Sequence, residues 1–241
     1  MTGVDNVLRA SAAREEAERA IKFAFCAVIK YVKVLFGVDS ISCHSENWCQ
    51  KLTVGTMPRF KQSKAAQVAA FFAQAEGGKI NVLKLIKLMY LADRRFMQWH
   101  KAPILYDNFY SLDHGPVGSM SYDLLQGNIE DSREWDQWIT DRANHEVGLN
   151  RSANRADLDQ ISDAEFETLS EIWKQFGHMN QWAIRDWTHR NCREWKDPHG
   201  SSLPFDYEDV FVAFGMDRPE AGEIQEKLEE DKRIAKILDR V

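Results

Sequence analysis

Asp93 and His114 are the two residues whose types could do chemistry in this chain. Asp93 lies on an apolar stripe with Met89 and Phe96. Burying a carboxylate without a partner costs free energy, so Asp93 needs a hydrogen-bonding or cationic partner. His114, or a backbone amide of the loop that contains it, is the expected partner. The simplest role of Asp93 is then to fix this loop to its helix.

A catalytic interpretation of the same loop is weak. Ser119 or Ser121 could act as a nucleophile with His114 and Asp113. Neighbours in sequence rarely have the geometry of a catalytic triad, and the loop has no nucleophile-elbow motif. Pro116 fixes its own φ and Gly115 permits an unusual backbone, so the segment predicts a tight turn. We expect no catalytic residue and no enzyme.

The cysteines do not suggest a metal site. The four are Cys26, Cys43, Cys49 and Cys192. Cys43 and Cys49 have no second ligand pair at a spacing that zinc requires. We therefore expect free thiols in a reducing cytoplasm, no metal and no cofactor.

Length and composition place the chain among globular proteins. Its 241 residues, 44% of them hydrophobic and 28% charged, can form one sizeable domain or a domain with an extension. The net charge of −6 gives no broad electrostatic footprint for phosphate, which disfavours nucleic acid as a partner. The apolar run 23–36 is too short to span a bilayer and is interrupted by Lys30 and Lys33. A cytoplasmic protein without a membrane partner is expected.

From Ser63 onward the sequence predicts a succession of helices with recognisable ends. The expected helices are 65–75 before Gly77-Gly78, 82–99 capped by Asn81, 120–126 capped by Ser119, 163–176 opened by the Ser162–Glu165 capping box, 181–191, 207–214 capped by Asp206, and a charged helix from Pro219. Segments 106–112 and 145–150 are expected to be short strands that pair with each other. The fold class is mainly α: a compact helical domain with a minor two- or three-stranded antiparallel β element, plus an N-terminal helical extension.

The helix 82–99 is apolar around most of its circumference and should be central to the domain. Its solvent-exposed strip is expected to consist of Lys84, Lys87 and Arg94. Together with Arg95, these residues could pair with an acidic surface of a partner protein or with nucleic acid. The tryptophans 173, 182, 187 and 195 lie at roughly helical spacings and are expected in the core.

The chain divides into three parts by sequence character. Residues 1–56 are an extension, 57–216 the main domain and 217–241 a helical tail. The extension is either a small helical hairpin that adds a contact surface, or a segment of limited importance upstream of a functional start at Met57. The amphipathic segments 21–36 and 224–238 are candidates for contacts with a partner helix, or else for ordinary packing.

The order of several motifs resembles the Panacea domain of SocA-like antitoxins, which also occurs in phage-associated proteins of the GepA type. The matching pieces are KLIKLMYLADRRF (84–96), LDHGPVGSMSYDLL (112–125), SDAEFETLSEIWKQFG (162–177), WAIRDWTHRNCREW (182–195) and FDYEDVFVAFG (205–215). The resemblance covers about residues 63–215. It implies a structural signature made of Tyr90, Asp93, His114, Gly115, Pro116, His189 and Trp195.

Such a resemblance implies a partner rather than a substrate. The partner would be a cognate toxin protein encoded by the adjacent gene and neutralised by direct binding. The alternatives are an adaptor that delivers the toxin to a protease complex and a DNA-binding regulator of the operon. We expect the partner-binding residues to include Lys87, Arg94, Tyr110, His114 and Tyr122.

Overall fold

The structure, a computed structural model, describes residues 59–238. In this range the chain is mainly helical with two small antiparallel sheets, which confirms the predicted fold class. The described helices are α3 (Gln62–Ala75), α4 (Val82–His100), α5 (Ser119–Gln126), α6 (Arg133–Asp136), the short 3-10 helix η1 (Arg155–Asp157), α7 (Asp163–Phe176), α8 (Gln181–Asn191), α9 (Tyr207–Ala213) and α10 (Arg218–Leu238). None of these helices is long and apolar enough to cross a membrane. The predicted N-terminal helical extension and the segment 21–36 lie outside the described residues.

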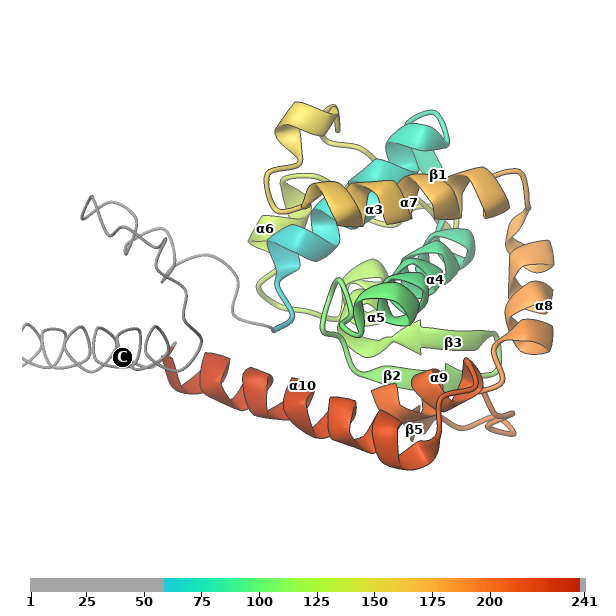
Figure 1. Ribbon diagram of the computed structural model, residues 1–241. Helices are drawn as coiled ribbons and strands as arrows, with labels where there is room; N and C mark the ends of the chain where they lie inside the picture. The colour runs from blue at the N-terminus through green and yellow to red at the C-terminus, as the bar shows by residue number, and fades with distance from the viewer. Residues whose placement is uncertain (1–58, 239–241) are drawn as a thin grey trace, which may run out of the picture. The chain divides into compact units, whose positions relative to one another are not determined.

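Helix α4 is the central element of this unit. Its start is fixed as predicted, because the Asn81 side chain accepts hydrogen bonds from the amides of Leu83 (3.0 Å) and Lys84 (3.3 Å). It ends at His100, and the next residue, Lys101, adopts a left-handed conformation. Helices α3, α7 and α8 pack against it, with α7 crossing above it and α8 at one end in Figure 1. The core is therefore built around one helix that is buried on nearly every side.

Other helix ends also follow the sequence. The Ser162–Glu165 capping box opens α7, and Asp206 occupies the N-cap position of α9. The predicted cap at Ser119 is wrong, since the side chain at that position makes no capping bond. The carboxylate of Asp107 takes that role by accepting from the amides of Met120 and Ser121, both at 2.9 Å.

The strands differ most from the prediction. The three-stranded sheet has the order β3 (Gly115–Gly118), β2 (Phe109–Leu112), β5 (Leu203–Phe205), and the two-stranded sheet pairs β1 (Lys79–Asn81) with β4 (Glu146–Gly148). The expected pairing of 106–112 with 145–150 is therefore wrong. Strands of three or four residues carry too little alternation to specify a partner, so packing far along the chain decides the pairing.

The tail and the tryptophans pack differently from the expected pattern. Helix α10 buries Ala221, Leu228 and Ala235, while Ile234 of the amphipathic segment 224–238 is 43% exposed. Among the four tryptophans expected in the core, the prediction is wrong for Trp182, which is 50% exposed. The other three are half-buried.

Candidate functional site

The predicted His-Gly-Pro turn is the end of a β-hairpin held from two sides. Strands β2 and β3 pair from Phe109–Gly118 to Leu112–Gly115, which leaves Asp113 and His114 as the turn. From α4, Lys87 Nζ donates to the carbonyl oxygen of Pro116 at 2.8 Å. After α8, Trp195 Nε1 donates to the carbonyl oxygen of Leu112 at 3.0 Å. Each strand is thereby fixed through its backbone.

Gly115 is required where the hairpin meets α8. Its φ of +96° disfavours other residues, and a Cβ there would lie 2.8 Å from Thr188 Oγ1 and 3.2 Å from His189 Nε2. The imidazole of His189 stacks on Trp195 with 4.1 Å between ring centroids and 6° between planes. Burial and the nearby Lys87 lower the pKa of His189. Its Nε2 atom is buried and makes no hydrogen bond within residues 59–238. The hairpin, α8 and the segment after it thus form one packed assembly.

The prediction that Lys84, Lys87 and Arg94 form a solvent-exposed strip on α4 is wrong. Lys87 is fully buried, and burial lowers its pKa from 10.5 to about 7. Lys84 is buried as well, with Nζ bonded to Glu76 Oε2 at 2.5 Å and to the Gly177 carbonyl oxygen at 2.8 Å. Long aliphatic stems let lysines line a packed helix while each ammonium reaches an acceptor. These cations are structural groups of the core.

Glu194 is a central residue that the sequence reasoning missed. Its buried carboxylate accepts from Tyr90 Oη and Arg94 Nε, both at 2.5 Å, and from a second Arg94 nitrogen at 3.2 Å. The neighbouring thiol of Cys192 is also buried, which raises its pKa to about 12. One signal in the sequence could have pointed to such an acceptor. Tyr90 and Arg94 lie four residues apart on one face of a helix, and both need a hydrogen-bond acceptor if they are buried.

Asp93 has a hydrogen-bonding partner, as predicted, but His114 is not that partner. Its Oδ1 accepts from the backbone amides of Ile104 (2.6 Å) and Leu105 (2.9 Å). Burial raises its pKa from 3.8 to about 7, although these two hydrogen bonds oppose the rise. Asp93 therefore fixes the segment that follows α4, whereas Lys87 fixes the hairpin.

The five expected partner-binding residues do not form one surface. Lys87 is fully buried, and Arg94 is bonded to Glu194 with a side chain only 12% exposed. His114 is exposed at the hairpin turn, Tyr110 lies nearer the opposite end of β2, and Tyr122 is half-buried on α5. Among the signature residues, the structure brings Gly115, Pro116, His189 and Trp195 together at the hairpin.

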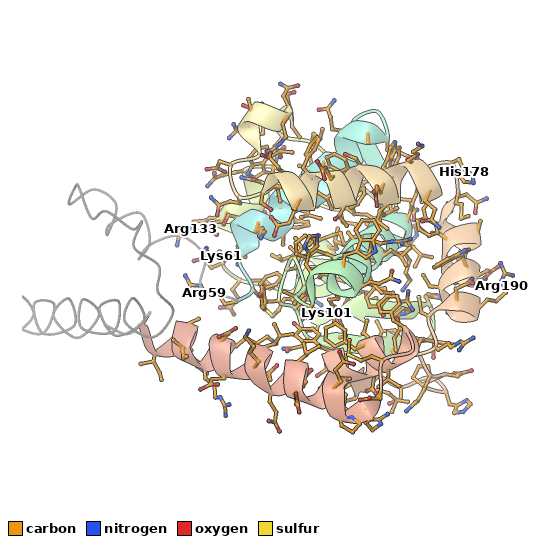
Figure 2. The ribbon with its side chains drawn as sticks, in the orientation of Figure 1. Arg59, Lys61, Lys101, Arg133, His178 and Arg190 are labelled. Carbon is orange, nitrogen blue, oxygen red and sulfur yellow. The ribbon has the colours of Figure 1, made fainter. Side chains whose placement is uncertain are left out.

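The exposed part of this assembly contains a tryptophan that we did not expect there. His114 lies edge-to-face with Trp182 of α8, with ring centroids 6.2 Å apart. The guanidinium of Arg185 lies 5.0 Å from the centre of the Trp182 ring. Figure 2 shows Arg190 projecting outward from the same helix and His178 at the turn that leads into it. We call His114, Trp182 and Arg185 the hairpin-tip cluster.

The residues considered for nucleophilic chemistry have separate structural contacts. Ser119 Oγ lies 3.4 Å from Asp107 Oδ1, and Asp113 accepts from the amide of Gly200 at 2.9 Å. Within residues 59–238, no group of three His, Cys, Asp or Glu side chains is placed to hold a metal ion.

Comparison with known proteins gives one family match. Comparisons with curated proteins and with solved structures find no match. The matched model is described as antitoxin SocA-like, Panacea domain, and it spans α4 from Leu85 onward, the hairpin, α7, α8 and Trp195. Residues 85–196 thus match the SocA-like antitoxin, Panacea domain, the family that the motifs resemble.

Proposed function

We propose that this chain is an antitoxin that neutralises a cognate toxin by binding it directly and covering its active surface. The match of residues 85–196 to the SocA-like antitoxin family carries this proposal. The family also suggests a regulatory role without catalysis. Occlusion needs only a complementary interface with a few desolvated anchor residues.

The arrangement of the matched region supports a rigid binding surface. Lys87, Asp93 and Trp195 bond to backbone groups of other segments, and Glu194 joins Tyr90 to Arg94. A surface whose backbone is fixed before binding loses less conformational entropy on association. The polar groups of the motif thus favour a scaffold that presents the residues around it.

The hairpin-tip cluster is our candidate for the centre of the contact. Tryptophan and arginine are enriched among the residues that dominate binding energy in interfaces. Trp182 is half exposed, and its contacts to Arg185 and His114 hold its ring in place. The cluster therefore offers a pre-positioned aromatic anchor.

Trp182→Ala tests this surface, with Trp99→Ala as its matched control. Trp99 is 53% exposed, lies in the last turn of α4 and has the Arg95 guanidinium 5.5 Å from its ring centre. We expect Trp182→Ala to weaken binding of the adjacent-gene toxin by about 2 kcal/mol, roughly 30-fold. Growth rescue on co-expression should fall accordingly, while Trp99→Ala should behave as wild type.

Two results would contradict the proposal at different levels. Equal effects of the two tryptophan substitutions would remove the hairpin-tip cluster from the interface. A toxin that remains fully active when the wild-type chain is co-expressed would remove the antitoxin function itself.

A further inference from the structure

A cavity of about 210 Å³ lies between the three-stranded sheet and α10, away from the hairpin tip. It lies where β2 and β5 meet the start of α9 and the middle of α10. Its lining combines aromatic rings with charged side chains and includes Tyr110, Phe205, Asp206, Tyr207, Glu229 and Lys232. This volume is ample for one long side chain of a partner.

One wall of the cavity already accommodates an ammonium group. Lys232 Nζ lies 4.5 Å from the centre of the Tyr207 ring and 3.0 Å from Glu229 Oε1. Its side chain is 18% exposed. A cation over an aromatic face beside a carboxylate is a favourable arrangement for lysine and arginine. The chain's own lysine thus shows which chemistry this lining suits.

The adjacent half of α10 concentrates the negative charge of the protein. Residues 219–231 contain six carboxylates and one lysine, a net charge of −5 in a chain whose total is −6. Glu220, Glu223, Glu226 and Glu230 are exposed. Figure 1 shows α10 beside α9 and β5, on the side of the sheet away from α7. A partner meets a strongly acidic helix next to the cavity.

We propose that this cavity and the acidic half of α10 form a docking surface for a basic segment of the toxin. One lysine or arginine of that segment enters the cavity, where it meets the carboxylate of Asp206 and the ring of Tyr110 and competes with Lys232 for the carboxylate of Glu229. Charge complementarity selects this occupant, because an acidic surface attracts a basic partner and repels an acidic one. The inference rests on the proposed function, since the toxin supplies the segment.

Tyr110 of the cavity lining and His114 of the hairpin-tip cluster belong to the same β-hairpin. Tyr110 and the turn residue His114 are four positions apart, roughly 13 Å along the strand direction. A standard-size interface buries about 800 Å² on each partner, which is wide enough to include both residues. One toxin molecule can therefore contact both places.

The double substitution Asp206→Asn with Glu229→Gln removes two charges from the cavity while preserving shape. Asn is as good an N-cap as Asp, so α9 keeps its start. The matched control, Glu167→Gln with Glu171→Gln, makes the same charge change at exposed positions of α7. We expect about tenfold weaker toxin binding for the cavity variant and a weaker dependence on salt. The α7 variant should bind as wild type does.

A second measurement does not need the toxin. A tetra-arginine peptide is titrated into the full-length chain, labelled with 15N, and amide shifts are followed by NMR. The shifts should centre on Tyr110, Asp206 and the 225–232 segment, and the cavity variant should lose them. A tetra-glutamate peptide should leave these amides unchanged.

The outcomes separate the two proposals. Equal weakening by both double variants, or peptide shifts spread over the whole surface, would overturn the docking surface. Localised peptide shifts together with a toxin that never binds the wild-type chain would overturn the antitoxin function and its toxin segment, and would leave a site for basic side chains.

Discussion

At the scale of single residues, the motif groups act on backbone and on each other. Lys87 holds the Pro116 carbonyl, Asp93 holds two amides after α4, and Trp195 holds the Leu112 carbonyl. Buried polar groups are tolerated where they are bonded in this way. Lys87 and Trp195 therefore position the hairpin, whereas Asp93 positions the segment that follows α4.

Glu194→Ala should strongly destabilise the fold. The substitution leaves the Arg94 guanidinium and the Tyr90 hydroxyl buried without their acceptor, which costs about 3–5 kcal/mol for such a pair. Urea unfolding measures the loss. Asp131→Ala breaks an exposed pair with Arg133 and should leave stability unchanged. Similar unfolding midpoints for the two variants would contradict the structural role of Glu194.

Lys87 and Asp93 should give the folded protein an unusual dependence on pH. The pKa of Lys87 falls from 10.5 to about 7 on folding, so the unfolded chain holds the proton more tightly. Stability should therefore rise between pH 7 and about 10. The pKa of Asp93 rises from 3.8 to about 7 on folding, so here the folded chain holds the proton more tightly. Stability should therefore fall as the pH rises from about 4 to 7.

Substitutions at these two positions separate the two slopes. Unfolding of Lys87→Met, followed at a series of pH values, should lack the rise above pH 7. Asp93→Asn should lack the fall in stability that the wild type shows as the pH rises from about 4 to 7. Wild-type slopes retained in both variants would show that other groups cause the dependence.

At the scale of elements, helices could be predicted and strand pairing could not. Asn81 and Ser162 fix helix starts through contacts within three residues of themselves. Asp107 instead caps a helix more than ten residues away, and β5 reaches β2 from the far end of the domain. Such contacts leave no periodic trace in the sequence. Trp182 was misplaced because helical spacing does not say which face a helix buries.

Gly115→Ala tests the junction between hairpin and α8, with Gly127→Ala as its control. Both glycines have positive φ, +96° and +74°, but a Cβ at position 127 meets nothing within 4 Å. Gly127→Ala should cost about 1 kcal/mol from backbone strain alone. Gly115→Ala should cost roughly 1–3 kcal/mol more, because Thr188 and His189 must move. Equal unfolding midpoints for the two variants would mean that Thr188 and His189 move aside at little cost in free energy.

At the scale of the whole molecule, the described unit separates rigid support from recognition. The buried network lies between α4, the hairpin and the segment after α8. The exposed hairpin-tip cluster and the acidic half of α10 lie outside that network. Under the proposed function, this network would support the backbone while the exposed groups contact the toxin.

Inhibition of the purified toxin by the purified chain, without any protease, tests direct neutralisation most simply. If neutralisation is direct, activity of the adjacent-gene toxin should fall in proportion to the complex formed, and Trp182→Ala should require a higher concentration for the same inhibition. A toxin that stays active in the stable complex, and is silenced only when a protease is added, would contradict neutralisation by direct binding.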